Sequence, residues 1–143
     1  MILTLTTATR TQFIDITARI QQAVDSRGVS SGVCMVFVPH TTAAVTINEN
    51  ADPDVPRDMD GLLDRLIPWS GGYRHVEGNS AAHMKATLVG ASELVAIEQG
   101  RLVLGLWQSV FFCEFDGPRT RKVHLQFIPA MEKNHEAADN RRE

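Results

Sequence analysis

The stretch HTTAAVTINENADPDVPRD, residues His40–Asp58, gathers imidazole, hydroxyl, amide and carboxylate groups around a short apolar core. An almost continuous apolar run, Val33–Val38, precedes it, bounded by a glycine and a proline, and this pattern predicts a strand buried on both faces. Residues Ala43–Ile47 predict a second short strand. His40 therefore lies at a strand end, where a rigid scaffold can hold a functional group within reach of a ligand.

The length and composition fit a single globular domain. The chain has 143 residues, of which 43% are hydrophobic and 22% charged, as is usual for globular proteins. We expect one domain over residues 1–130 and a frayed polar tail over 131–143. A net charge of −3 argues against a nucleic-acid-binding surface. The sequence lacks a membrane-length apolar run and signal-peptide features, so we expect a cytoplasmic protein that binds no membrane. Cys34 and Cys113 lie in apolar runs, which favours buried free thiols.

Hydrophobic spacing predicts three helices, each with a start or stop signal. The first begins after Asp15 and ends at Gly28, and the second begins at Asp54 and ends before Pro68. The third follows an Asn79 N-cap and is expected to point four apolar side chains inward: Ala81, Met84, Leu88 and Ala91.

Four further segments are typical of strands. An opening strand is expected at Leu3–Thr7, and an antiparallel meander is expected in the last third of the chain. In the final strand, apolar side chains alternate with polar ones, which predicts one buried and one polar face. The expected strands of the meander are Leu94–Ile97, Leu102–Phe115 and Lys122–Ile128.

Three histidines form the first candidate site. His40 at a strand end, His75 in a loop and His83 on a helix could together hold one divalent metal. Their spacing is not diagnostic, however, and the alternative is that each is a surface or hydrogen-bonded structural histidine. His124 and His135 are assigned to the polar strand face and the tail, with no role.

Carboxylates supply a second candidate site. They could bind magnesium beside a phosphate, or one could act as a base if burial raises its pKa. Asp54 is better explained as a helix cap, and Asp58 as a first-turn acid that the helix dipole favours. Strand alternation turns Glu49 inward, where a carboxylate needs a partner. The set comprises Glu49, Asp52, Asp54, Asp58 and Glu77.

A third candidate is an anion site at the start of the third helix. The backbone N–H groups of Gly78-Asn79-Ser80 and the guanidinium of Arg119 could bind a phosphate. The alternative is that Asn79 is only a helix cap.

Several ordered motifs carry a resemblance that extends from about Phe13 to Ile128. Together they resemble the YjbQ family, whose members are often labelled secondary thiamine-phosphate synthases. The resemblance implies a compact α+β domain of mainly antiparallel sheets with flanking helices, assembled as a homotrimer. The motifs are His40-Thr41-Thr42-Ala43, Asn48-Glu49-Asn50, Asp52-Pro53, His75, Glu77-Gly78-Asn79-Ser80-Ala81-Ala82-His83, Gly105-Leu106-Trp107-Gln108 and Phe115-Asp116-Gly117-Pro118-Arg119-Thr120-Arg121.

The resemblance also implies a pocket near the subunit boundary, lined by Glu49, Asn79 and Arg119. The metal, zinc or magnesium, would be held by His40, His75 and His83, and the catalytic residues would be Glu49 and His83. A phosphorylated small substrate would be bound by Asn48, Asn79, Ser80, Gln108 and Arg119.

The function implied in this way is metal-assisted chemistry on phosphorylated small molecules. Specifically, it is thiamine-phosphate synthesis from hydroxymethylpyrimidine diphosphate and thiazole phosphate. Two alternatives are a non-catalytic trimer that binds a metal or a phosphorylated metabolite, and a metal-dependent hydrolase in which Glu49 activates a zinc-bound water.

Overall fold

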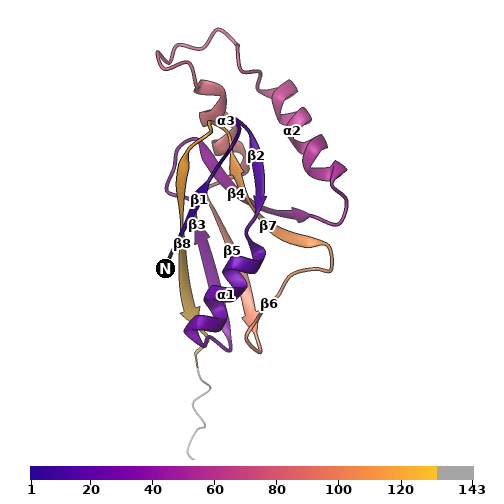
Figure 1. Ribbon diagram of the computed structural model, residues 1–143, viewed down its shortest axis with the longest axis vertical. Helices are drawn as coiled ribbons and strands as arrows, with labels where there is room; N and C mark the ends of the chain where they lie inside the picture. The colour runs from indigo at the N-terminus through magenta and orange to yellow at the C-terminus, as the bar shows by residue number, and fades with distance from the viewer. Residues whose placement is uncertain (132–143) are drawn as a thin grey trace, which may run out of the picture.

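The computed structural model describes residues 1–131 and places in them two antiparallel sheets and three helices (Figure 1). The predicted α+β class is confirmed, whereas the predicted tail lies almost wholly outside the described residues. In chain order the elements are β1 Ile2–Thr6, β2 Gln12–Asp15, α1 Thr17–Arg27, β3 Gly32–Phe37, β4 Ala43–Glu49, α2 Asp54–Leu66, α3 Ser80–Val89, β5 Ser92–Glu98, β6 Arg101–Leu102, β7 Gln108–Glu114 and β8 Thr120–Pro129.

One sheet has five strands in the order β1-β8-β3-β5-β6, and the other has three in the order β2-β7-β4. The predicted single strand Leu102–Phe115 is wrong, because β6 and β7 belong to different sheets. A turn separates them, in which the Gln108 backbone N–H donates to the Gly105 carbonyl at 3.0 Å. The predicted meander is therefore wrong as well.

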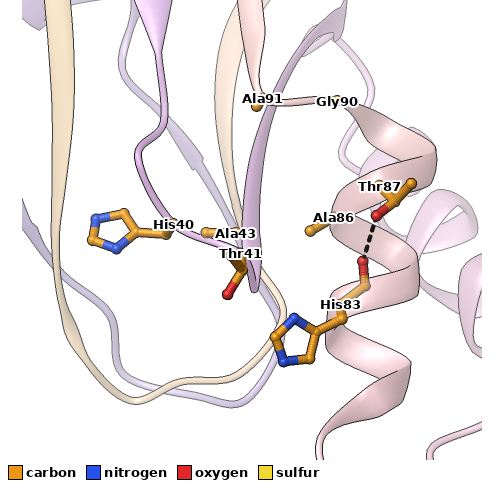
Figure 2. A pocket seen from close by; sticks show the side chains of 8 residues that line it. All are labelled: His40, Thr41, Ala43, His83, Ala86, Thr87, Gly90 and Ala91. Atoms are coloured by element: carbon orange, nitrogen blue, oxygen red, sulfur yellow. Dashed lines mark hydrogen bonds between the residues drawn. The ribbon is translucent and has the colours of Figure 1, made fainter.

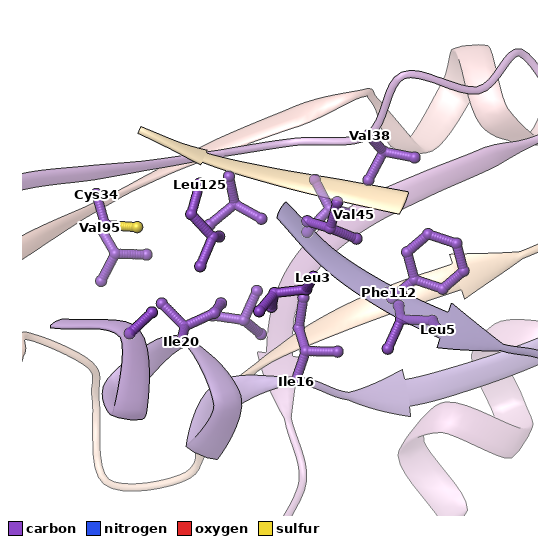
Figure 3. Close-up of a cluster of buried hydrophobic side chains, with 14 of the residues drawn as sticks. Leu3, Leu5, Ile16, Ile20, Cys34, Val38, Val45, Val95, Phe112 and Leu125 are labelled. Carbon is purple, nitrogen blue, oxygen red and sulfur yellow. The ribbon is translucent and has the colours of Figure 1, made fainter. Parts of the chain in front are cut away.

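The main core lies between the two sheets and α1 (Figure 3). Cys34 and Val36 of β3 are fully buried in it, but Phe37 of the same strand is 38% exposed. The prediction that this strand is buried on both faces is therefore wrong. The reason is that an antiparallel sheet needs only one face on the core. Both cysteines are free and buried, as predicted.

Helix α1 follows its sequence signals closely. Gly28 ends it in the left-handed conformation, at φ 63°, which costs glycine little. At the other end the Asp15 carboxylate accepts the Thr17 backbone N–H at 2.9 Å. The N-cap position itself is Ile16, one residue later than predicted.

Helix α3 covers the face of the three-stranded sheet that points away from the main core. Its small residues Ala82 and Ala86 pack there against Phe111 and Phe115. The predicted inward residues Met84 and Leu88 are instead 51% and 61% exposed. That part of the prediction is wrong, because the close helix–sheet contact uses the alanine face.

Helix α2 stands beside α3 (Figure 1), and none of its residues is buried. The Lys85 ammonium of α3, itself only 3% exposed, pairs with the Asp64 carboxylate of α2. At its start the Asp52 carboxylate accepts the Asp54 backbone N–H at 2.9 Å, so Asp52 and not Asp54 supplies the capping oxygen. Among the described residues no helix is both long and apolar enough to cross a membrane.

Candidate functional site

A pocket of about 450 Å³ lies between α3 and the segment that joins β3 to β4 (Figure 2). This volume is in the range of small-molecule sites. Its lining contains two histidines and two threonines, and no Lys, Arg, Asp or Glu. The lining residues are His40, Thr41, Ala43, His83, Ala86, Thr87, Gly90 and Ala91.

The imidazole of His40 points away from α3 (Figure 2) and is bound by β8. Its Nε2 accepts the backbone N–H of Lys122 at 2.9 Å, so this ring extends the hydrogen-bond ladder of β8. Burial, and then the nearby guanidinium of Arg121, lower the pKa of His40. Both the bond and the electrostatics therefore favour a neutral ring whose Nε2 is already occupied.

A buried ion pair lies behind the same segment. The guanidinium of Arg121 donates to the Glu114 carboxylate, with Nη2–Oε2 at 2.6 Å, and to the Thr42 hydroxyl at 2.8 Å. The Thr7 hydroxyl also donates to Glu114 at 2.8 Å. Since Glu114 belongs to one sheet and Arg121 to the other, this network fixes the two sheets and the pocket segment together.

The opposite wall is the second half of α3. The backbone N–H groups of Val38 and Val45 donate to the carbonyls of Ala91 and Gly90, at 2.8 and 3.1 Å, and hold the end of α3 between β3 and β4. The carbonyl end of a helix carries a partial negative charge. An uncharged ligand or a hydrogen-bond donor is favoured beside it over a polyanion.

His83 reaches the pocket from α3 and contacts a second histidine. The rings of His75 and His83 meet edge to face, with centroids 5.3 Å apart, and His75 Nε2 lies 3.9 Å from a Glu77 carboxylate oxygen. His40 does not join them. Across residues 1–131 no three His, Cys, Asp or Glu side chains are arranged to hold a metal ion, so a single chain does not fit a zinc or magnesium ion. Metal binding stays a prediction from the resemblance.

The predicted acid and amide residues lie at the other end of β4. Glu49 pairs with Gln108 of β7, six residues from Ala43, which is roughly 20 Å along a strand. The neighbouring Asn48 directs its amide to the Met59 sulfur at 3.6 Å. Within one chain these residues are separate from the histidine pocket.

The predicted phosphate clamp is assembled around a carboxylate of the protein itself. Asn79 Nδ2 and Arg119 Nη2 both donate to Asp116 Oδ2 at 2.9 Å. Within the described chain the other amide atom, Asn79 Oδ1, is buried without a hydrogen-bond partner. Ser80 lies elsewhere, in a shallow hollow with His75, His83 and Met84.

Sequence reasoning assigned no role in the site to several residues that shape the pocket, although two of them, Thr41 and Arg121, lie in the motifs quoted above. Thr41 and Thr87 give no pattern of their own, but Glu114 and Arg121 could have been found. A Glu inside the apolar run Val110–Phe115 and an Arg on the apolar face of β8 are buried charges, and buried charges require partners.

Fold and pocket together define a small two-sheet α+β protein with a pocket, lined by His40 and His83, beside a short helix. The sequence model of the family described as UPF0047 protein YjbQ-like matches residues 1–130. The chain belongs to this family. The YugU protein of Bacillus subtilis is 50% identical over 127 residues, covering 88% of this chain and 96% of that protein.

Solved structures agree with this assignment. A YjbQ/UPF0047 family protein of Clostridium acetobutylicum superposes with a TM-score of 0.88 at 55% identity, covering 90% of this chain and 99% of that chain. A protein of Sulfolobus solfataricus, described as YbjQ-like and of unknown function, gives a TM-score of 0.86 at 31% identity, covering 90% and 95%.

These relatives correct the predicted function. They are described only as UPF0047 proteins, or as a protein of unknown function, and nothing in them indicates thiamine-phosphate synthesis or metal-dependent catalysis. The pocket agrees, because its lining has no basic side chain to neutralise a diphosphate. The prediction of a thiamine-phosphate synthase is wrong, and so is the prediction of metal-dependent catalysis.

Proposed function

We propose that this chain binds a small polar molecule of low charge in the pocket between α3 and residues 40–43. The observation that carries the proposal is the lining itself, which combines hydroxyl and imidazole groups with alanines and contains no charged side chain. The volume of about 450 Å³ accommodates a molecule with a single ring. Apolar contact with the alanines would supply affinity, and the polar groups would orient the ligand.

Three probes that share one ring and differ in charge test this proposal: benzyl alcohol, benzoate and benzyl phosphate. Binding is followed by ligand-observed NMR and by titration of backbone amide shifts. We expect benzyl alcohol to bind and benzyl phosphate to bind most weakly, because the helix end repels a dianion. His83→Ala should weaken the binding of benzyl alcohol, whereas His124→Ala, on the exposed face of β8, should leave it unchanged. Tightest binding by the phosphate, or no binding by any probe, would refute the proposal.

We also propose that the chain assembles with copies of itself as a homotrimer. Leu62 and Leu66 on α2 are 51% and 70% exposed, and Trp107 is 62% exposed, so an apolar helix face and an aromatic ring lack cover in one chain. A neighbouring copy would cover them, and could bring Glu49 and Gln108 toward another chain's histidines.

Light scattering coupled to size exclusion tests this assembly. Wild type should elute at about 47 kDa, which is three times the 15.8 kDa of one chain. The double variant Leu62→Gln with Leu66→Gln should fall toward the single-chain mass, whereas Arg65→Gln on the same helix should not. A wild-type mass of one chain at micromolar concentration would refute the trimer.

A further inference from the structure

We infer that Thr41 provides the hydroxyl with which the pocket recognises its ligand, and that strand β8 holds it in place. This inference rests on the proposed binding function, and it names a specificity residue within that site.

The residues on both sides of Thr41 are anchored to the sheets. His40 accepts the Lys122 backbone N–H at 2.9 Å, and Thr42 accepts the Arg121 guanidinium at 2.8 Å. The Thr42 carbonyl also accepts the Phe115 backbone N–H at 3.1 Å. Because Arg121 and Lys122 are consecutive in β8, one strand fixes both neighbours and leaves Thr41 little backbone freedom.

Thr41 itself is exposed and faces the pocket. Its hydroxyl and the His83 imidazole point into the same space between the segment and α3 (Figure 2). The other hydroxyl of the lining, on Thr87, donates to the His83 carbonyl at 3.0 Å. Its proton is therefore committed, and it offers a ligand only lone pairs. Within residues 1–131 no such bond uses the proton of Thr41, so this hydroxyl can both donate and accept.

Removal of the Thr41 hydroxyl without loss of volume tests the recognition step. Thr41→Val should lower the affinity for benzyl alcohol about three- to tenfold, which corresponds to the loss of one hydrogen bond. Thr41→Ser should restore the wild-type affinity. Toluene, which has the same ring and no polar group, should bind both proteins equally. Thr4→Val makes the same substitution at an exposed position of β1 and should change the affinity for neither ligand.

The positioning step has a readout that needs no ligand. In wild type the Lys122 amide should be protected from hydrogen exchange by His40. His40→Ala should remove this protection and weaken benzyl alcohol, and His40→Gln should restore both, because its amide oxygen can accept the same N–H.

The outcomes separate this inference from the binding proposal. If wild type binds benzyl alcohol and Thr41→Val binds it equally well, the inference is overturned and the binding proposal stands. Equal Lys122 exchange in wild type and His40→Ala would overturn the role given to β8. If wild type binds no probe, the binding proposal fails first, and the recognition role of Thr41 fails with it.

Discussion

Replacement of Arg121 by Met removes the cation of the buried pair while keeping an unbranched apolar stem. The side chains of Arg121 and Glu114 are 6% and 0% exposed. The guanidinium gives Glu114 an Nε–Oε1 bond of 2.9 Å and an Nη2–Oε2 bond of 2.6 Å. It also gives Thr42 a bond of 2.8 Å. A longer Nε–Oε2 bond of 3.2 Å to Glu114 completes the set. All of these bonds are lost in the variant, and the carboxylate remains in the interior.

The expected cost follows from the donors that remain. Loss of one partner of a buried ion pair costs about 3–5 kcal/mol of unfolding free energy. Glu114 keeps the Thr7 hydroxyl at 2.8 Å and the backbone N–H groups of Phe115 and Asp116 at 3.1 and 3.2 Å. We therefore expect the lower end, about 3 kcal/mol, which for a domain of this size lowers Tm by roughly 10 °C.

Urea unfolding followed by circular dichroism, at one protein concentration, measures this change. Arg119→Met is the matched control, because its guanidinium is 52% exposed in its pair with Asp116 and should cost at most about 1 kcal/mol. The double variant Arg121→Met with Glu114→Gln should be more stable than Arg121→Met alone, since the uncompensated charge is gone. A loss below about 1 kcal/mol for Arg121→Met, or additive losses in the double variant, would refute the reasoning.

Two further predictions concern titrating groups. Burial, and then the neighbouring carboxylate of Asp64, raise the pKa of Asp60, so the folded state binds this proton more readily than the unfolded state and the ionised form costs stability. Asp60→Asn should therefore raise Tm at pH 7, and the gain should shrink as pH falls. A lower Tm in Asp60→Asn would contradict this prediction. As a control, Asp64→Asn should lower Tm, because Lys85 loses its partner. The second group is His40, whose pKa is lowered in the folded state. Its contribution to folding stability is therefore full above about pH 6.5 and is lost as the pH falls through its folded-state pKa. Thermal scans from pH 5 to 8 should show this loss in wild type and not in His40→Gln, and equal slopes in the two proteins would contradict it.

The elements that the sequence predicted well are those set by local chemistry. Gly28 ends α1 because glycine adopts a positive φ at little cost, and the alternation in β8 places Val123 and Leu125 in the core. The errors arose where tertiary contacts override a local pattern. The run Leu102–Phe115 is mostly apolar, and the polar interruption at Gln108 and Ser109 does not show that its two ends pair with different sheets.

The prediction of the inward face of α3 was wrong for a related reason. Hydrophobicity alone ranks Met84 and Leu88 above alanine as core residues. Close packing against the three-stranded sheet instead selects the smallest side chains, and it buries Lys85 because α2 supplies a carboxylate. Which face of a helix packs inward thus depends on the shape and charge of its partner, information that the helix sequence does not contain.

The site residues show the same limit for polar groups. His75 and His83 do meet, but a list of imidazoles, amides and guanidinium groups does not tell which of them are already paired. Asn79 and Arg119 resemble an anion clamp until Asp116 is found between them, and His40 resembles a ligand until Lys122 is found at its Nε2. Thr41 shows the opposite case. The sequence gives no reason to select it, but in the structure both its neighbours are hydrogen-bonded to β8 while its own hydroxyl faces the pocket. In this fold a polar residue is a strong functional candidate when its neighbours are hydrogen-bonded to the sheets and its own side chain faces a pocket.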